Sequence, residues 1–349
     1  MPDSTRIAIL AHEKFPGRAK TAVGLLRYAD HEVVAVLDRE IAESDPDARV
    51  NDYVPDVQDA PIVGRAADAP EYDVLVVGIA PIGGGFDESW RPDVETAIES
   101  GADVWAGLHY FLAEDEGFAD LAAEHGVDIW DVRRPPEDLT VAEGTAGDVD
   151  ATVVLTVGSD CSTGKMTATM ELVEAARDRG WNAGFVATGQ TGAMIAGEGI
   201  VVDRVVSDFT AGATERMVLD AAEDDDYVFV EGQGSIVHPA YSAVTCGILH
   251  GAMPDALVLC HEAGREVVHG YESFSLPDPG SLVSLYEGLA APVHEGSVVA
   301  GSLNTQGLDD AAAADAVAGY ADAIGAPAVD PVRDGAGPLL DAIGEVEGE

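Results

Sequence analysis

A lysine in a glycine-containing loop is the strongest chemical signal in this sequence. Residues 158–167 read GSDCSTGKMT, and Gly164-Lys165 stands directly before a helix-like segment. Main-chain N–H groups at such a helix start attract phosphate oxygens, and the lysine ammonium adds a positive charge. We therefore predict a loop that holds a cofactor phosphate through Gly158, Ser159, Cys161, Ser162, Thr163, Gly164, Lys165, Met166 and Thr167.

Two departures from the usual P-loop pattern narrow the chemistry. Gly158 lies six residues before Gly164, one more than usual, so Ser159 stands at the expected glycine position. Met166 follows the lysine, where a serine or threonine normally binds Mg²⁺. Loss of that hydroxyl favours a cofactor that is held but not cleaved at its phosphate. Asp160, within the loop, could orient the loop amides, bind a cation or face a substrate amine.

Two further residues are candidates for proton transfer. Glu231 ends the apolar run VFV, and the ends of parallel strands carry functional groups in this architecture. It could hold a metal or act as a general base. His238 follows closely and titrates near neutral pH, with a structural role as its alternative. The remaining histidines show no metal-ligand spacing, and we predict no metal site.

Substrate contacts are predicted from arginines, lysines and amides. Arg204 and Arg265 could each bind a carboxylate, with a surface ion pair as the alternative. The chain has only three lysines, and two of them, Lys14 and Lys20, flank one strand-to-helix turn, so Lys20 is a further candidate, with the nearby Arg18 as its alternative. We expect Gln190 to line the same crevice as the P-loop. Asn304, which follows a strand, could contact the adenine of a cofactor.

Alternating strands and helices predict an α/β protein with two doubly wound domains, each built on a parallel sheet. The predicted division is an N-terminal Rossmann-like domain at 1–135, a linker at 136–150 and a P-loop NTPase-like domain at 151–349. The first domain lacks a G-x-G-x-x-G fingerprint. Strands are predicted at 6–11, 32–37, 73–80, 103–106, 127–130, 151–157, 183–187, 227–231, 256–260 and 297–302. Helices are predicted near 20–30, 93–100, 118–125, 165–179 and 309–324, and a glycine turn at 83–85.

The charge balance is extreme, with 64 acidic against 18 basic residues and a net charge of −46. The acids are spread through segments of normal apolar periodicity and do not form an acidic tail. We therefore predict a folded, halophilic protein adapted to the molar salt of a haloarchaeal cytoplasm. The same charge argues against nucleic acid and anionic membranes as partners. Three widely spaced cysteines, no signal peptide and no apolar run of ~20 residues fit a cytoplasmic location.

Several stretches together resemble a known family. They are 20–28, 158–167, 188–196, 231–250, 256–265 and 301–305, and they are similar to the family that includes D-glutamate N-acetyltransferase. That family joins a Rossmann-like domain to a P-loop domain. The displaced glycine and the Lys165-Met166-Thr167 sequence match its own pattern. The P-loop half also resembles dethiobiotin synthetase.

The resemblance implies acetyl transfer from acetyl-CoA to the amine of D-glutamate or a related amino acid. For this reaction our hypothesis is that the loop amides hold cofactor phosphate, that Asn304 contacts the adenine, and that Glu231 or His238 is the base. Substrate carboxylates would meet Arg204 with Lys20 or Arg18. We also expect a homo-oligomer. Two alternatives stay open: a ligase or kinase of the dethiobiotin synthetase type that uses ATP with Mg²⁺, and a non-catalytic nucleotide-binding module.

Overall fold

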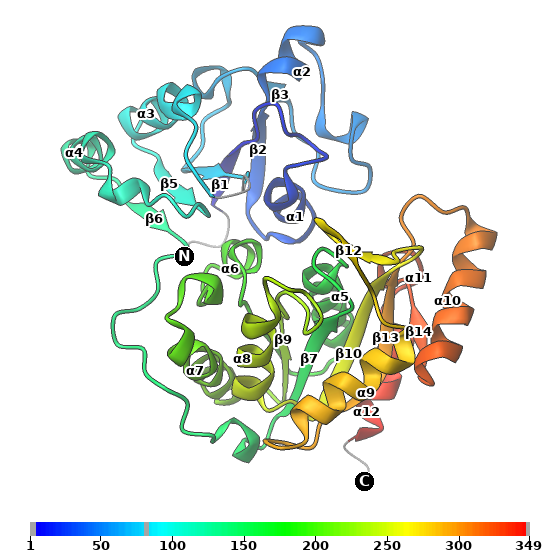
Figure 1. Ribbon diagram of the computed structural model, residues 1–349. Helices are drawn as coiled ribbons and strands as arrows, with labels where there is room; N and C mark the ends of the chain where they lie inside the picture. Colours follow the sequence, from blue (N-terminus) through cyan, green and yellow to red (C-terminus); the bar gives the residue numbers. More distant parts are fainter. Residues whose placement is uncertain (1–4, 80–83, 347–349) are drawn as a thin grey trace. The chain divides into compact units, whose positions relative to one another are not determined.

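The computed structural model describes residues 5–79 and 84–346 and divides the chain into two compact units (Figure 1). The first unit contains Met1–Pro135 and Gln190–Arg204, and the second contains Pro136–Gly189 and Val205–Glu349. The segment Gln190–Arg204 lies inside the second domain in the sequence-based division, but it is part of the first unit in the structure.

The first unit is built on a six-stranded sheet of order β3-β2-β1-β4-β5-β6, in which every pairing is parallel. Its strands are β1 (Arg6–Leu10), β2 (Glu32–Leu37), β3 (Ile62–Val63), β4 (Val74–Val77), β5 (Asp103–Ala106) and β6 (Ile129–Asp131). Its α-helices are α1 (Lys20–Tyr28), α2 (Arg39–Ser44), α3 (Arg91–Glu99), α4 (Glu116–His125) and α6 (Gln190–Ala196). The order reverses between β1 and β4, the position at which open α/β sheets bind ligands.

Helix α6 joins the first unit through contacts with α1. The hydroxyl groups of Thr21 and Thr191 lie 2.8 Å apart and are buried. Gly107 leaves room for the side chain of Gln190, whose Cγ would lie 3.0 Å from a Cβ at that glycine. Arg133 and Asp203 add an ion pair at the end of the segment. These contacts join residues far apart in sequence, so periodicity along the chain gave no sign of them.

The second unit is built on a parallel six-stranded sheet of order β14-β13-β10-β7-β9-β8. Its strands are β7 (Thr152–Gly158), β8 (Ala183–Val186), β9 (Tyr227–Val230), β10 (Ala256–Glu262), β13 (Ser297–Asn304) and β14 (Ala328–Val329). Its helices are α5 (Lys165–Asp178), α7 (Thr210–Ala222), α8 (Ser242–Ala252), α9 (Pro279–Ala290), α10 (Asp310–Ile324), α11 (Pro331–Asp334) and α12 (Gly337–Gly344). A small antiparallel hairpin, β11 (Val267–Val268) and β12 (Tyr271–Ser275), follows β10.

A core of buried apolar side chains fixes α5 against this sheet. Leu172 and Val173 of α5 pack with Phe229 of β9 and with Leu340 and Ile343 of α12. Alternate residues of the central strands point into this core, as expected for strands buried on both faces. Helices α8 and α9 lie across the sheet from α5 (Figure 1). The P-loop at the start of α5 is therefore attached to a rigid layer.

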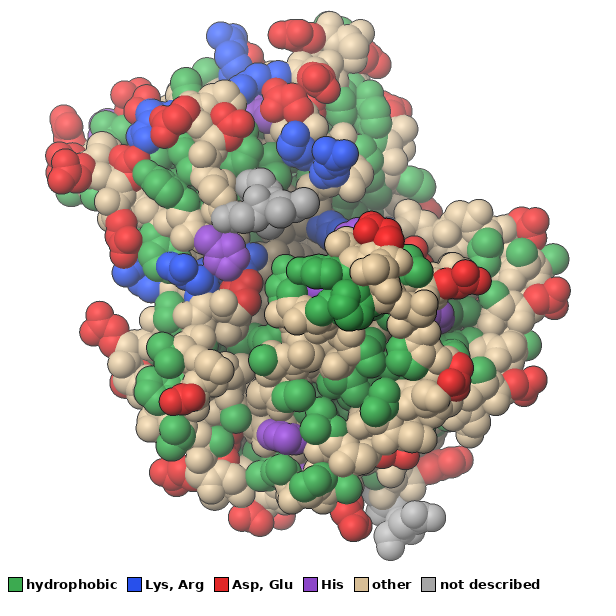
Figure 2. Space-filling view, in the orientation of Figure 1, with side chains coloured by type: hydrophobic (Ala, Val, Ile, Leu, Met, Phe, Trp, Pro, Cys, Tyr) green, Lys and Arg blue, Asp and Glu red, His purple; other side chains and the backbone are tan. Residues whose placement is uncertain are grey.

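Aspartates serve as helix N-caps throughout the chain. Their carboxylates accept hydrogen bonds from main-chain N–H groups at the first turn, which stabilises a helix by about 1 kcal/mol. These residues are Asp38, Asp87, Asp115, Asp278, Asp309 and Asp330. Part of the acidic excess therefore has a structural role, while other acids are scattered over the visible surface (Figure 2).

The predicted fold class is confirmed: both sheets are parallel and belong to α/β units. The predicted strands and helices are present with shifted ends; β6, for example, begins two residues later than predicted. The short strands β3 and β14 and the β11–β12 hairpin were not predicted. Parts of the predicted strand at 73–80 and of the turn at 83–85 lie outside the described residues. Among the residues that the structure describes, no helix is long and apolar enough to cross a membrane.

Candidate functional site

The P-loop, residues 158–165, connects the central strand β7 to α5. Strand β7 lies between β10 and β9, so the loop is at the carboxyl end of the sheet where the strand order reverses. The loop turns sharply through Ser162 (φ 58°) and Gly164 (φ 95°), both in the left-handed region. Gly164 adopts this conformation without the steric cost that a side chain brings. The predicted placement of Lys165 at the start of a helix agrees with the structure.

Lys165 points back into its own loop. Its Nζ donates a hydrogen bond to the main-chain carbonyl oxygen of Asp160 at 2.8 Å. The side chain is buried, and burial lowers the pKa of the ammonium, an effect that nearby groups including Asp160 and Glu231 oppose. A Cβ at residue 158 would lie 2.6 Å from this Nζ, which explains the glycine there. Met166 and Thr167 are partly buried on the first turn of α5.

Asp160 ties the loop to the segment that follows β10. Its Oδ1 accepts a hydrogen bond from the N–H of Cys161 at 2.7 Å, and its Oδ2 accepts one from the N–H of His269 at 2.7 Å. Arg265 donates to Oδ2 at 3.3 Å and to the carbonyl oxygen of Cys161 at 2.6 Å, and it also pairs with Glu262. Of the three roles considered for Asp160, these contacts match the orientation of loop groups.

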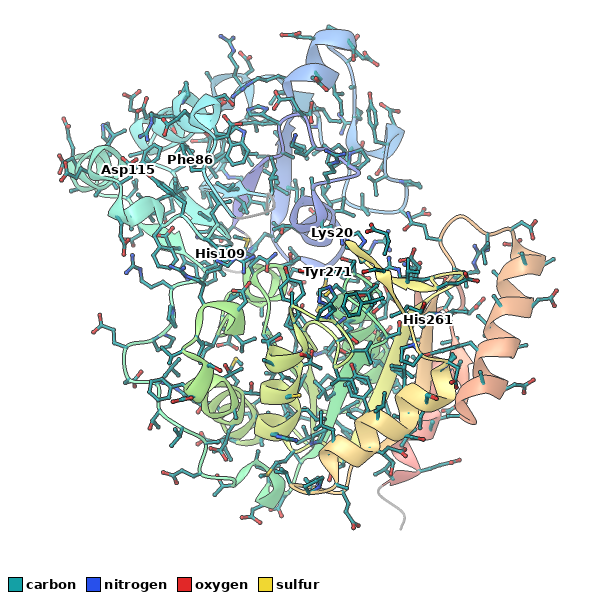
Figure 3. The ribbon with its side chains drawn as sticks, in the orientation of Figure 1. Lys20, Phe86, His109, Asp115, His261 and Tyr271 are labelled. Carbon is teal, nitrogen blue, oxygen red and sulfur yellow. The ribbon has the colours of Figure 1, made fainter. Side chains whose placement is uncertain are left out.

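A second set of contacts holds the start of the loop. The hydroxyl of Ser159 lies 2.7 Å from Nδ1 of His261, which is on β10 (Figure 3). The main-chain oxygen of Ser159 accepts a hydrogen bond from Ser235 at 3.0 Å, and that of Gly158 accepts one from Tyr286 at 2.7 Å. His261, which the sequence gave no functional signal for, is thus a support of the loop.

Glu231 directly follows β9 and is buried. Burial raises the pKa of its carboxyl to about 7, although hydrogen bonds from the N–H of Gly189 and the amide of Gln233 oppose the shift. The Gly189 hydrogen bond reaches Oε2 at 3.1 Å. A carboxyl group that titrates near neutral pH can accept a proton from a substrate and return it. Glu231, one of the two candidate bases, therefore has a pKa shifted toward neutral pH, and its role stays a prediction.

His238 is buried between two tyrosine rings. Its Nδ1 accepts a hydrogen bond from the N–H of Ala240 at 3.1 Å. In a neutral imidazole the other nitrogen then carries the proton, so Nε2 is a donor. The ring centroids of Tyr241 and Tyr271 lie 4.6 and 5.1 Å away, and Tyr271 is on β12 (Figure 3). These contacts favour His238 as a hydrogen-bond donor rather than as the base.

The P-loop groups and His238 meet at one point of the second unit. The Sγ of Cys161, a ring nitrogen of His238 and a carboxylate oxygen of Asp160 all lie within 4.8 Å of one another. Asp160 and His238 are buried, whereas Cys161 is partly exposed.

The predicted substrate residues are divided between the units. Arg265 is near the P-loop, but its guanidinium is engaged by Asp160 and Glu262. Arg18, Lys20, Gln190 and Arg204 belong to the first unit. The guanidinium of Arg204 lies 4.7 Å from the centre of the Phe111 ring. Their roles toward a substrate stay predictions.

Asn304 is at the end of β13, which pairs with β10. Its Oδ1 accepts a hydrogen bond from the N–H of Gln306 at 3.0 Å. This bond leaves the side-chain NH₂ as the group that could contact an adenine. The assignment of adenine to Asn304 stays a prediction.

A buried polar cluster in the first unit was missed. His12 directly follows β1 and is fully buried, with its Nε2 3.0 Å from a carboxylate oxygen of Asp93. Burial by itself raises the pKa of the Asp93 carboxyl. Hydrogen bonds from His12, Ala66 and Arg39 outweigh this effect and hold the pKa below its usual value. Nδ1 of His12 has no hydrogen-bond partner among the described residues. The position of His12 after the first strand, at a sheet's carboxyl end, was the signal available in the sequence.

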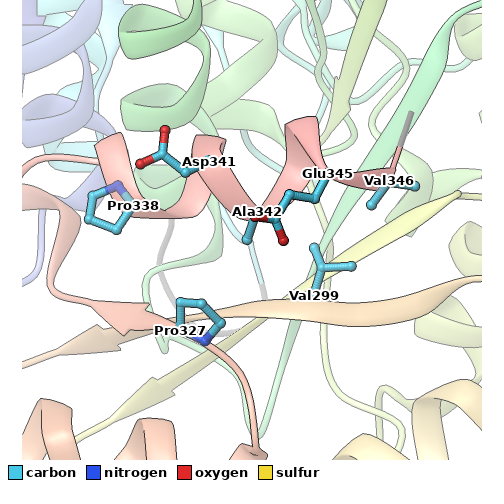
Figure 4. Close-up of a pocket in the computed structure, with 7 residues that line it drawn as sticks. All are labelled: Val299, Pro327, Pro338, Asp341, Ala342, Glu345 and Val346. Carbon is cyan, nitrogen blue, oxygen red and sulfur yellow. The ribbon is translucent and has the colours of Figure 1, made fainter. Parts of the chain in front are cut away.

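A pocket of about 470 Å³ lies elsewhere in the second unit, between α12 and the strand β13 (Figure 4). Val299, Pro327 and Ala342 form its apolar part, with Asp341 and Glu345 beside them. None of the P-loop residues lines it, so we assign it no role in the chemistry above.

Comparison with known proteins identifies relatives over most of the chain. The P-loop domain of DUF1611, described as a domain of unknown function, matches residues 140–340, and the Rossmann-like DUF1611 domain matches residues 43–135. A protein named D-glutamate N-acetyltransferase from Tritonibacter scottomollicae is 37% identical over 80% of this chain and 84% of its own length. One of the same name from Pseudoalteromonas sp. is 35% identical over 76% of this chain and 80% of its own length.

A solved structure is similar throughout. The crystal structure of a DUF1611 family protein from Anabaena variabilis is 39% identical, with a TM-score of 0.92 over 98% of this chain and 99% of that one. The family resemblance inferred from the sequence is therefore confirmed. This chain belongs to the DUF1611 family, which joins a Rossmann-like domain to a P-loop domain and includes the proteins named D-glutamate N-acetyltransferase.

Proposed function

We propose that this chain transfers an acetyl group from acetyl-CoA to the amine of D-glutamate or a related amino acid. The observation that carries the proposal is the buried carboxyl of Glu231, whose pKa is raised to about 7, beside the lysine of an anion-binding loop. The activity named for the two relatives, which share more than a third of their aligned residues with this chain, points to the same reaction.

The site residues divide the chemistry among them. An amino acid arrives as an ammonium ion, which is not nucleophilic until it loses a proton. Glu231 is the group that accepts this proton, and the amine then attacks the thioester carbonyl. Nε2 of His238 donates a hydrogen bond to the oxygen on which negative charge develops. Lys165 and the loop amides bind an anionic group of a substrate.

Met166 supports a reaction that leaves phosphates intact. Mg²⁺-dependent cleavage of ATP uses a serine or threonine hydroxyl after the P-loop lysine, and a thioether cannot replace it. Acetyl transfer makes no such demand. The proposal therefore favours acetyl-CoA over ATP as the second substrate, in a salt-rich cytoplasm as the composition predicts.

A thiol-release assay tests the proposal. Acetyl-CoA is offered with a panel of D- and L-amino acids in ~2–3 M KCl, a range in which surface charges are strongly screened. ATP consumption is measured in parallel with the same panel. We expect release of coenzyme A that depends on an amino acid, with acidic side chains preferred. ATP consumption without any release of coenzyme A would contradict the proposal and favour a ligase or kinase.

A further inference from the structure

The thiol of Cys161 lies in the P-loop beside two buried polar groups. Its Sγ, a ring nitrogen of His238 and a carboxylate oxygen of Asp160 are all within 4.8 Å of one another. Asp160 is fully buried and His238 is 1% exposed, whereas Cys161 is only partly buried. Cys161 is therefore the most exposed of the three residues.

These three residue types could also hold a metal ion, but their contacts oppose that use. Both carboxylate oxygens of Asp160 already accept main-chain N–H groups, from Cys161 and His269. The guanidinium of Arg265 lies 3.3 Å from the second oxygen and would repel a cation. Nδ1 of His238 is occupied by the N–H of Ala240, so Nε2 carries a proton and has no lone pair for a metal.

The same contacts suit a nucleophilic sulfur. A thiolate is stabilised by neighbouring cations, by donated hydrogen bonds and by the start of a helix. Cys161 has each of these nearby. Arg265 donates to its carbonyl oxygen at 2.6 Å, a ring nitrogen of His238 lies within 4.8 Å of its Sγ, and the 14-residue helix α5 begins four positions later at Lys165. The carboxylate of Asp160 lies within the same distance of the sulfur and opposes them, but its own charge is engaged by Arg265 and two main-chain N–H groups. The loop therefore places a partly exposed cysteine beside hydrogen-bond donors and a helix start that favour a thiolate.

We propose that Cys161 carries the acetyl group between the two substrates, an inference that rests on the proposed acetyltransferase function. In the first step the sulfur of Cys161 bonds to the acetyl carbon, the bond from that carbon to the sulfur of coenzyme A breaks, and the thiol proton of Cys161 ends on coenzyme A. In the second step the amine bonds to the acetyl carbon, and the bond to Cys161 breaks. The ammonium of the amino acid gives up two protons in all: Glu231 takes the first before the attack and releases it to water, and the second, lost from the nitrogen as the amide forms, returns the thiolate of Cys161 to the thiol.

If Cys161 carries the acetyl group, the P-loop faces the acetyl group and the amino acid instead of the phosphates of coenzyme A. The long pantetheine arm separates the thioester of acetyl-CoA from its phosphates, so a thioester at Cys161 places the phosphates away from the loop. The loop amides and Lys165 then face the carbonyl oxygen in the first step and a carboxylate of the amino acid in the second. The cofactor-phosphate role predicted for the loop from its sequence is replaced in this arrangement by binding of other anions.

Mass spectrometry of the intact protein tests the proposal. The full chain in molar KCl is mixed with acetyl-CoA alone, and we expect one acetyl group per chain on the peptide that contains Cys161, with release of an equal amount of coenzyme A. Addition of the amino acid should remove that group. Initial rates at varied concentrations of both substrates should show ping-pong kinetics.

Two variants make the test specific. Cys161→Ala should lose the acetyl adduct and about a thousandfold or more in turnover, as when a nucleophile is removed from other acyl-transfer sites. Cys246→Ala is the matched control, because Cys246 is partly buried in α8 of the same unit and should keep both. Thermal unfolding of each variant checks that it is folded.

The outcomes separate the two proposals. If the wild-type chain acetylates an amino acid while Cys161→Ala keeps comparable turnover, the Cys161 step is wrong and the proposed function stands. If Cys161 becomes acetylated but no amino acid removes the group, the acceptor named in the proposed function is wrong and the Cys161 step stands. If neither an adduct nor an acetylated amino acid forms, both are overturned.

Discussion

The ammonium of Lys165 donates to the main-chain carbonyl oxygen of Asp160, five residues earlier in the same loop, at 2.8 Å. The lysine thus closes the loop on itself, and the side chain of Asp160 extends the closure to His269 and Arg265 of the following segment. A positive charge is held in place before any anion arrives. Under the proposed function, an incoming anion meets a lysine that the loop already holds in position.

Replacement of Lys165 by methionine should separate activity from stability. We expect Lys165→Met to lower turnover about 100-fold to 1,000-fold, the usual cost of removing one positioned charge or donor from an active site. Thermal stability should be unchanged or higher, because an apolar side chain of similar length replaces a buried charge. The measurements are initial rates and thermal unfolding.

Arg179→Met is the matched control, since Arg179 directly follows the other end of the same helix and pairs with Asp341 on the surface. It should keep wild-type turnover. Wild-type turnover in Lys165→Met as well would contradict the role given to the loop.

The pH dependence of the reaction should report Glu231. A base acts only when it is deprotonated, so kcat/KM should fall as pH decreases below about 7, the pKa to which burial raises this carboxyl. In Glu231→Gln the rate should be strongly reduced, and kcat/KM of any remaining activity should not fall as pH decreases below about 7. If kcat/KM of the variant still fell below about pH 7 as in the wild type, the base would be another residue.

The carboxyl of Glu231 should make the protein less stable as pH rises, although the rise in pH increases activity. Between about pH 4.5 and 7 the unfolded chain loses this proton while the folded chain keeps it, so the free energy of unfolding falls as pH rises. A shift of this size corresponds to about 3 kcal/mol in total. Glu231→Gln should therefore gain stability relative to the wild type as pH rises from about 4.5 to 7, as measured by denaturant unfolding. A constant difference across this range would contradict the raised pKa.

Asp115 should stabilise the first unit as a helix cap and ion-pair partner. Its Oδ1 accepts the N–H groups of Gly117 and Phe118, and its Oδ2 accepts hydrogen bonds from Arg91 at 2.7 Å and from Tyr110 at 2.8 Å (Figure 3). Arg91 holds the pKa of this carboxyl well below its usual range. The stabilisation is thus present above the usual carboxyl pKa and is lost in acid.

Asp115→Ala should cost about 1–2 kcal/mol of unfolding free energy at neutral pH. Tryptophan fluorescence in a Trp181→Phe background reports this loss selectively, because the other tryptophans, Trp90, Trp105 and Trp130, are all in the first unit. Asp120→Ala, an exposed position of the same helix, should change stability by less than about 0.5 kcal/mol. Equal losses in the two variants would contradict the assignment.

Stability should depend strongly on salt. A net charge of −46 makes the folded surface repel itself, and the screening length falls from ~10 Å at 0.1 M to ~3 Å at 1 M salt. We expect the thermal midpoint to rise steadily with KCl up to about 2 M. Sucrose at matched osmolality is the control, because it does not screen charge. A midpoint that is independent of KCl would contradict adaptation to high salt.

The layout of the sheets could be predicted because it is encoded locally. The apolar run of β7, Thr152–Gly158, is buried and leads into a glycine-containing loop, so both the strand and the P-loop were visible in the sequence. The hairpin that holds the loop was not visible. Every residue of β12, Tyr271–Ser275, is exposed, so no alternation between buried and exposed positions marks it as a strand.

Contacts between distant residues could not be predicted. His12 and Asp93 are 81 positions apart, and Glu231 takes its hydrogen bond from Gly189, 42 positions away. The sequence left Glu231 and His238 as alternative bases. The different roles that we propose for them rest on two features of the structure: the N–H of Ala240 occupies Nδ1 of His238, and burial raises the pKa of Glu231 to about 7.

Direct detection of the product tests the central claim, that this site acetylates an amino acid. The wild-type chain and Glu231→Gln, both shown to be folded in ~2 M KCl, are incubated with acetyl-CoA and D-glutamate, and N-acetylglutamate is measured by mass spectrometry. The account predicts catalytic formation of this product, or of the acetylated form of a related amino acid in the panel, by the wild type and a severe loss in the variant. Absence of any acetylated amino acid with the folded wild type, or equal rates for the two proteins, would contradict it.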